Sequence, residues 1–135
     1  MPALNTLATQ TFDANLTYAD VVHIVHLYVI EPHPLDPDPS PYSGVVWEAQ
    51  YTTKRQPMNY ADRVAAARDM LPFIEGEQLV LVDDLTPRAS NNPVWCTYGP
   101  CPNCAYLIRQ DGIIDSVQNW VDVLQMQTNI DRLLR

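Results

Sequence analysis

Apolar residues gather in a few short runs, separated by polar and proline-rich stretches. The clearest run is residues 21–30 (VVHIVHLYVI), which is nearly all β-branched or apolar and is typical of a strand. Because the apolar residues are continuous rather than alternating, we expect this strand to be buried on both faces of a mostly parallel sheet. His23 and His26 lie three positions apart and point to opposite strand faces, so we expect structural histidines rather than a shared metal.

The other apolar patterns predict a chain that mixes helices and strands. Asn59 is typical of a helix N-cap, Pro72 ends the alanine-rich segment that follows, and Asp111-Gly112 predicts a hairpin turn. The predicted elements are helices at 2–10 and 59–71, a strand at 78–82, a loop or short helix at 87–98, hairpin strands at 105–110 and 113–117, and a helix at 119–134. The fold class is therefore α/β, one domain over residues 1–135, with a mixed central sheet that ends in a β-hairpin and a terminal helix.

The last predicted helix is amphipathic. Its apolar stripe consists of Trp120, Val123, Leu124, Gln127, Ile130 and Leu134. A different pattern occupies residues 31–57, which begin with a proline-rich run and predict a long, stiff loop. We expect Trp47 and Tyr51 to fix this loop on the body, and a loop of this length in a small domain is more often functional than idle.

Composition and charge narrow the classes of function. The 135 residues are 47% hydrophobic, which is typical of a globular domain with one core. Eight basic against sixteen acidic side chains give a net charge of −8, which disfavours nucleic acids and anionic membranes as partners. Apolar runs fall short of the roughly 20 residues of a membrane span. No signal peptide is apparent, so the localisation is cytoplasmic by default.

Five separate pieces of the chain follow a common pattern. They are residues 2–5 (PALN), 28–33 (YVIEPH) with Asp36, 62–67 (DRVAAA), 79–83 (LVLVD), and Tyr98-Gly99 with Pro102 and 105–108 (AYLI). In this order and at similar spacings, they resemble the iodothyronine deiodinase family and its bacterial deiodinase-like relatives. The resemblance extends over nearly the whole chain and implies a thioredoxin-like fold in its peroxiredoxin-like variant.

The resemblance implies roles for three residues. Glu31 and His33 match the Glu and His that lie beside the active site in the family and take part in substrate handling. A carboxylate and an imidazole at the carboxyl end of a strand suit acid–base work at the edge where α/β sheets bind ligands. The alternative is that both are ordinary loop residues held by the prolines. Pro102 matches the proline before the last strand pair, which is usually cis in this fold.

The family's nucleophile has no counterpart in this chain. The catalytic selenocysteine, or cysteine, precedes the helix that residues 2–5 would continue, and the first cysteine here is Cys96. The strand that carries it, the first of the fold, is missing too, which leaves the strands at 21–30 and 105–110 with unpaired edges. Three arrangements remain open. The two strands pair directly, a partner chain donates a strand, or an upstream segment of a longer gene product, interrupted by a selenocysteine codon, completes the sheet.

Cys96, Cys101 and Cys104 form the second chemical feature. An odd number of cysteines cannot close wholly into internal disulfides. The three are structural thiols or include one disulfide, or one of them is a resolving thiol for an upstream nucleophile. A third alternative is zinc binding with a His or Asp as fourth ligand. No metal site is assigned, because no fourth ligand follows closely along the chain.

The resemblance implies a deiodinase-like oxidoreductase that uses a thiol or selenol and consumes a thiol reductant, with no other cofactor. The catalytic group itself is absent from this chain. The rival hypothesis is a catalytically silent thioredoxin-like subunit that docks on a partner chain. Exposed sheet edges, the stiff proline-rich loop, Trp47 and Trp95 are features that such a subunit would use.

Overall fold

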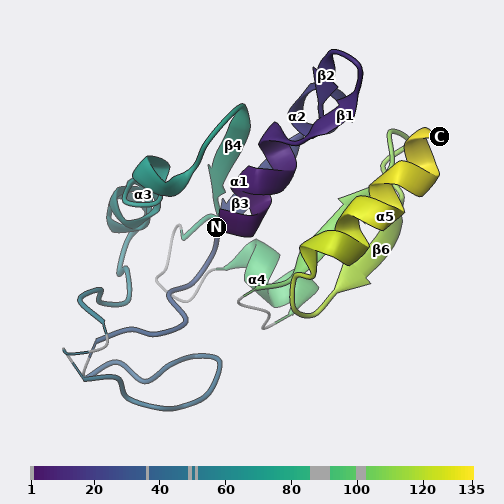
Figure 1. Cartoon of the computed structure of the whole chain (residues 1–135). Helices are drawn as coiled ribbons and strands as arrows, with labels where there is room; N and C mark the ends of the chain where they lie inside the picture. Colours follow the sequence, from purple (N-terminus) through teal and green to yellow (C-terminus); the bar gives the residue numbers. More distant parts are fainter. Residues whose placement is uncertain (1, 36, 49, 51, 86–91, 100–102) are drawn as a thin grey trace.

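The computed structural model describes residues 2–35, 37–48, 50, 52–85, 92–99 and 103–135. Its elements are α1 (Pro2–Thr9), β1 (Thr11–Asp13), β2 (Leu16–Thr17), α2 (Tyr18–Val21), β3 (Ile24–Tyr28), α3 (Tyr60–Arg68), η1 (Leu71–Phe73), β4 (Gln78–Val82), α4 (Pro93–Tyr98), β5 (Ala105–Ile108), β6 (Ile114–Gln118) and α5 (Val123–Leu134). The protein is a mixed α/β protein with small sheets of parallel and antiparallel strands (Figure 1). Within the described ranges, no helix has the length and apolarity needed to cross a membrane.

Two strand pairs form the centre of the molecule. β3 and β4 run parallel in register from Ile24 opposite Gln78 to Tyr28 opposite Val82. β5 and β6 form the predicted hairpin, in which Gly112 takes a positive φ of 82° and its N–H donates to the Arg109 carbonyl at 2.9 Å. A residue with a side chain adopts this φ only under strain, so the glycine explains where the hairpin turns.

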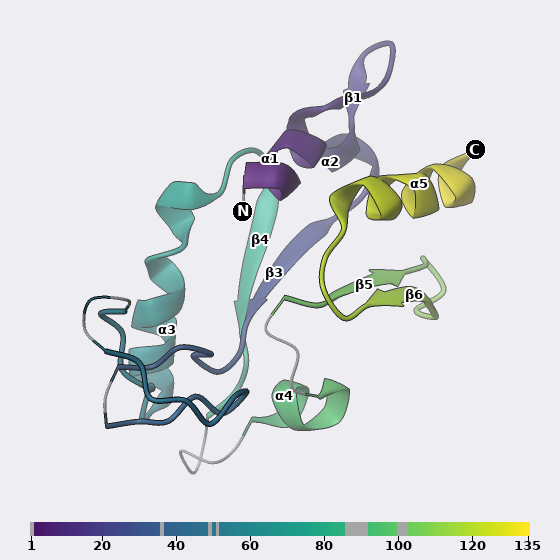
Figure 2. The same cartoon turned by 60° about the horizontal axis from the view of Figure 1, so that its bottom comes forward.

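The strands do not join into the expected single sheet. In the described part of the chain, β3 pairs only with β4 and β5 pairs only with β6, and β1 with β2 makes a third two-stranded sheet. In Figure 2, β3 lies beside β4 and β5 lies beside β6. Of the three arrangements expected for these two strands, direct pairing is therefore not the one observed. The described residues therefore do not form the single mixed sheet expected for a thioredoxin-like fold.

The hydrophobic core lies between helices rather than under β3 and β4. Leu7 of α1, Tyr18 of α2, and Met126 and Ile130 of α5 are its buried members. The Tyr18 hydroxyl donates to Asp131 Oδ1 at 2.7 Å and so fixes α2 against α5. Ala105 and Leu107 of β5 pack against this cluster, and α5 therefore covers one face of the hairpin.

The prediction that the first strand is buried on both faces was wrong. Val25 and Leu27 of β3 are 46% and 40% exposed, while His26, on the opposite face, is buried and its Nε2 lies 2.7 Å from Gln78 Oε1. A continuous apolar run fits a strand with one bare apolar face as well as a strand enclosed on both sides. His26 is thus a structural histidine, and His23, which precedes β3, is exposed.

The start of that strand was also predicted too early. Residues 18–21 form α2, whose first turn is held by a capping box in which the Asp20 carboxylate accepts from Thr17 N–H and Oγ1. The short β1–β2 hairpin before it was not predicted. Its strands have three and two residues, which is too short for an alternating pattern to be recognised.

The apolar stripe of the last helix was predicted correctly at Val123 and Ile130, which face the core, and wrongly at Trp120 and Leu124. Trp120 and Leu124 are 65% and 76% exposed, whereas Met126 and Ile130 are buried. The reason is that α5 begins only at Val123, after Asp122, whose carboxylate accepts from the Gln125 N–H. Trp120 therefore lies outside the helix, and the buried stripe is built around Met126.

The predicted N-cap of the central helix is confirmed. The Asn59 side chain accepts from Asp62 N–H at 2.9 Å at the start of α3. The long loop before it contains isolated bridges between Leu35 and Trp47 and between Pro39 and Val46, which tie Trp47 to another part of the same loop. Tyr51, the other predicted anchor, lies outside the described residues.

Candidate functional site

The candidate site lies just beyond the carboxyl ends of β3 and β4, where α/β proteins commonly bind ligands. Glu31 follows β3 by three residues, and its side chain is buried, with only 9% exposed. Tyr28 Oη donates to Glu31 Oε2 at 2.9 Å, and the His33 N–H donates to Oε1 at 3.3 Å. Gln56 accepts from the Glu31 N–H at 2.9 Å and donates to its carbonyl at 3.1 Å. Glu31 is therefore held by both its side chain and its main chain.

His33 lies next to Glu31, but its ring has a different neighbour. The imidazole packs edge-on against Trp47, with ring centroids 4.7 Å apart, and the residue is exposed. The bond between the two predicted site residues thus runs from the His33 main chain to the Glu31 carboxylate. The Glu31 carboxylate is thus buried, while His33 two positions further along the chain is exposed to solvent.

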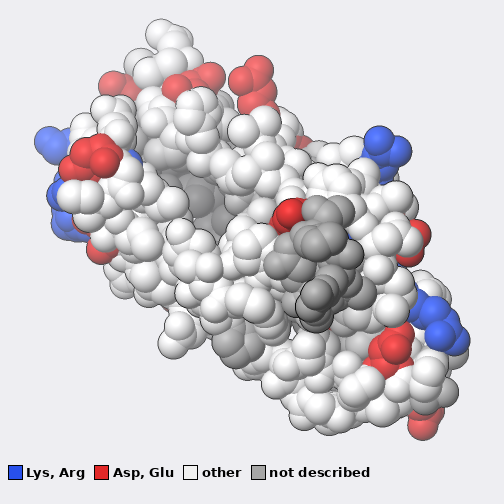
Figure 3. Space-filling model, turned by 180° about the vertical axis from the view of Figure 1, so that it is seen from behind, with Lys and Arg blue, Asp and Glu red and all other residues white. Residues whose placement is uncertain are grey.

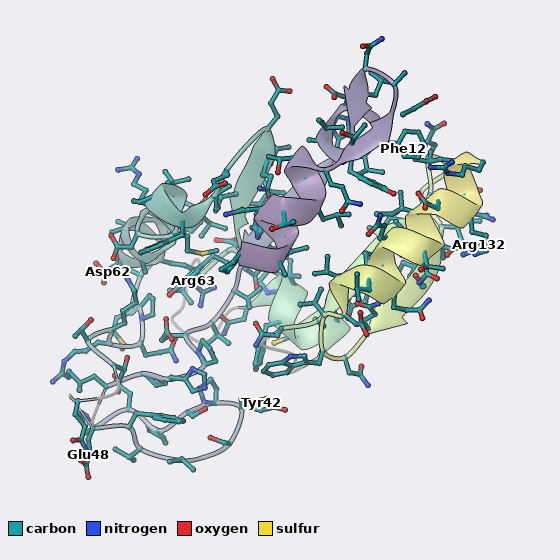
Figure 4. All side chains as sticks on the ribbon, viewed as in Figure 1. Phe12, Tyr42, Glu48, Asp62, Arg63 and Arg132 are labelled. Atoms are coloured by element: carbon teal, nitrogen blue, oxygen red, sulfur yellow. The ribbon has the colours of Figure 1, made fainter. Side chains whose placement is uncertain are left out.

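A second polar cluster joins β4 to two helices. Arg63 of α3 is 1% exposed and donates from Nη1 to the main-chain carbonyls of Asp83 and Asp84 at 3.3 and 3.1 Å. Its Nη2 donates to the Asn92 side chain. Figure 4 shows Arg63 directed from α3 into the molecule, whereas the neighbouring Asp62 points outward. The guanidinium therefore fixes the end of β4 to α3 and to the start of α4.

The buried carboxylate of Asp83 connects the two clusters. Its Oδ1 and Oδ2 accept from the Val94 and Trp95 N–H groups, each at 3.1 Å, at the first turn of α4. Its own N–H donates to the Tyr28 carbonyl at 2.9 Å. Hydrogen bonds therefore link Glu31, through Tyr28 and Asp83, to the helix that carries Cys96.

Burial and nearby charged groups shift the pKa values of Tyr28 and Arg63 in this region. Burial raises the pKa of the Tyr28 phenol well above its ordinary value, and the nearby Glu31 carboxylate raises it further. Burial lowers the pKa of Arg63, while the neighbouring carboxylates of Asp83 and Asp84 and the Tyr28 phenol oppose that effect. Tyr28 is therefore a neutral hydrogen-bond donor to Glu31 over the whole physiological range.

The predicted thiols are only partly described. Cys96 is an exposed free thiol on α4, and Cys104 is half-buried directly before β5. Cys101 and Pro102, with the expected cis peptide bond, lie outside the described residues. Among described side chains, no group of three His, Cys, Asp or Glu residues is placed to hold a metal ion.

One shallow pocket of about 300 Å³ lies between the long loop and α3. Lys54 and Asp69 form an ion pair in it, and Gln56 lines it from the side of Glu31. Its charged side chains neutralise one another, so it favours neither an anion nor a cation.

Several residues of the site were not predicted as such. Arg63 and Asp83 belong to two of the sequence pieces that carry the resemblance, and the acidic end of the strand at 78–82 was a usable signal. Gln56 and Asn92 have no such signal, because a polar residue in a loop becomes part of a site only through the fold.

The described residues form a mixed α/β protein with a polar cluster around the buried Glu31 beyond two parallel strands. No family model, no curated protein and no solved structure matches the chain.

Proposed function

We propose that this chain is the substrate-side part of a deiodinase-like, thiol- or selenol-dependent oxidoreductase of thioredoxin fold. Its nucleophile would lie on a strand between β3 and β5 that this chain does not supply. One observation supports the proposal: Glu31, whose carboxylate accepts from Tyr28, lies buried just beyond the carboxyl end of β3, and the described residues pair β3 with β4 but not with β5.

The chemistry follows from the placement of the groups. In a reductive dehalogenation, two thiols and a halogenated substrate give the reduced substrate, hydrogen halide and a disulfide. The thiol reductant thus supplies both electrons. His33 would exchange the proton, because its imidazole is exposed and imidazole nitrogens both donate and accept protons. Glu31, held by Tyr28 and Gln56, would position the His33 main chain.

The experiment restores the missing strand. The coding DNA upstream of Met1 is read with allowance for one recoded stop, and the extended protein is assayed for thiol-dependent halide release. We expect activity only in the extended protein, and a loss of about 100-fold or more in H33N. We expect E31Q to lose halide-release activity as well. The matched control is E48Q, which changes an exposed carboxylate of the same loop. Activity that is indifferent to both H33N and E31Q, or no activity at all, contradicts the proposal.

A second candidate function is the silent docking subunit. The observation in its favour is the exposed apolar face of β3 and β4, formed by Val25, Leu27, Leu79 and Leu81. Under this alternative, restoring the upstream strand yields no activity, and a stable complex buries β3 or β5 against another chain.

A further inference from the structure

The pocket between the long loop and α3 is lined by charges of both signs. Lys54 and Arg55 line it from the loop, and Asp62 of α3 and Asp69, the C-cap residue of that helix, line it from the other side. Small-molecule sites in proteins have volumes from about 300 Å³ upward. At about 300 Å³, this pocket has room for a ligand at the small end of that range.

One pair of these charges is already satisfied within the protein. Lys54 Nζ forms an ion pair with the Asp69 carboxylate. Within the described part of the chain, Arg55 forms no ion pair. Asp62 Oδ2 accepts from the Asn59 side-chain amide at 2.7 Å, and the described residues give its Oδ1 no donor. Because Arg55 and Asp62 are both exposed, one cation and one carboxylate at the pocket remain available to a ligand.

The surface between the charged groups is apolar and small. Ala65 and Ala66 follow Asp62 by three and four positions, and Asp69 follows it by seven, so all four lie on one side of the helix. This helix face therefore carries a carboxylate at each end and only methyl groups between them. Pro57, which is buried, lines the pocket from the loop. A short aliphatic group fits such a surface.

The mixture of charges selects against ligands that carry a single sign. An anion drawn to Arg55 is repelled by the carboxylate of Asp62, and a cation drawn to Asp62 is repelled by Arg55. In Figure 3, basic side chains lie near the edge of the molecule, where acidic side chains lie as well. A ligand that carries both charges satisfies both free groups.

We propose that this pocket binds a small dipolar molecule, namely a free α-amino acid with a short aliphatic side chain. Its carboxylate pairs with Arg55, because a guanidinium group presents two parallel donors to a carboxylate. Its ammonium group donates to Asp62. Its side chain lies on Ala65 and Ala66, and the volume of the pocket excludes a large side chain.

The pocket wall is connected to the candidate site through Gln56. Gln56 lines the pocket, and its side-chain amide binds both the N–H and the carbonyl of Glu31. The Leu35 N–H donates to the Lys54 carbonyl at 2.6 Å, which joins the same wall to the segment after His33. A ligand held between the loop and α3 therefore restricts the segment beside Glu31. The inference goes beyond the proposed function and does not depend on it, since binding requires no redox chemistry.

The experiment titrates the full chain, labelled with ¹⁵N, with L-alanine and follows the amide chemical shifts by NMR. We expect saturable shifts at residues 54–57 and 62–69, with a dissociation constant in the millimolar range, because ion pairs exposed to solvent are weak. Propionate lacks the ammonium group of alanine, and ethylamine lacks its carboxylate. Each should bind at least about tenfold more weakly. Absence of saturable shifts with L-alanine, or equal binding of propionate or ethylamine, overturns the inference.

Two variants test the assigned ion pairs. Arg55→Gln and Asp62→Asn should each weaken the binding of L-alanine by at least about tenfold. The matched controls are Arg68→Gln and Glu48→Gln, which remove the same charges from exposed side chains that do not line the pocket. Because Asp62 also bonds to the helix cap, Arg55→Gln keeps the test decisive if Asp62→Asn unfolds. Unchanged binding in Arg55→Gln, or equal weakening in Arg68→Gln, overturns the inference.

The outcome is separable from that of the proposed function. Selective binding of L-alanine to the chain without halide release from the extended protein upholds this inference and counts against the oxidoreductase. An active extended protein that does not bind L-alanine has the opposite meaning.

Discussion

The Tyr28 hydroxyl donates a hydrogen bond of 2.9 Å to the Glu31 carboxylate at the end of β3. The same tyrosine accepts, through its carbonyl, from the Asp83 N–H at the end of β4. One residue thus ties the candidate site to both parallel strands.

Replacing Tyr28 with Phe removes a donor from a buried carboxylate. We expect a loss of about 1 to 2 kcal/mol in the free energy of unfolding at neutral pH, measured by urea denaturation. Tyr42→Phe, which changes an exposed tyrosine of the proline-rich loop, should leave the unfolding midpoint unchanged (Figure 4). An unchanged midpoint in Y28F would show that the bond contributes nothing to the fold.

Tyr28 also predicts how stability depends on alkaline pH. Its pKa is raised in the folded protein, so above about pH 10 the unfolded chain loses this proton first. The unfolded state then binds fewer protons, and the free energy of unfolding falls as the pH rises. The contribution of the protonated Tyr28 phenol to the free energy of unfolding is fully present below about pH 10. Urea denaturation at several alkaline pH values should show a shallower fall in Y28F than in the wild type, and equal slopes would contradict the assignment.

We expect the loss of the buried Arg63 side chain to lower the free energy of unfolding strongly. Arg63→Ala leaves the Asp83 and Asp84 carbonyls and the Asn92 side chain without their donor, so we expect a loss of about 3 kcal/mol. Arg68→Ala, at the exposed end of the same helix, is the control and should not move the thermal midpoint. Similar midpoints for the two variants would contradict this network.

Two residues that the sequence assigns to the same apolar stripe of α5, Leu124 and Ile130, differ strongly in burial. Ile130→Ala should cost about 3 kcal/mol, because Ile130 is 4% exposed in the core. Leu124→Ala should be close to neutral, because Leu124 is 76% exposed. Thermal unfolding of both variants measures the difference, and an equal loss of stability in Leu124→Ala would support the stripe inferred from the sequence, to which both residues belong.

The exposed thiol of Cys96 predicts fast modification of the native protein. A thiol reagent should label Cys96 in a rapid phase that C96S lacks. The same titration with and without reductant, together with metal analysis, separates the three hypotheses for the cysteines. Three free thiols without metal exclude the disulfide and zinc alternatives, and a rapid phase that persists in C96S contradicts the exposure of this thiol.

Local features of the chain were well determined by the sequence. The cap at Asn59, the turn at Gly112 and the strand at 78–82 all depend on a few adjacent residues, and the structure has them where the pattern predicts. Glu31 and His33 were also predicted as neighbours, because both follow one strand by a few positions.

Relations between distant segments required the tertiary structure. Gln56 reaches Glu31 across 25 positions, and Arg63 reaches Asn92 across 29, and no local pattern encodes such contacts. The exposed face of Val25 and Leu27 is a similar case, since hydrophobicity shows that a side chain favours burial without showing what covers it.

The sequence by itself determined the mixed α/β class and the polar residues beyond the first parallel strand. Only the tertiary structure decided that, among the described residues, β3 pairs with β4 and β5 with β6 in separate sheets. The physical reason is that strand propensity is local, whereas pairing needs hydrogen-bonding partners from another part of a chain.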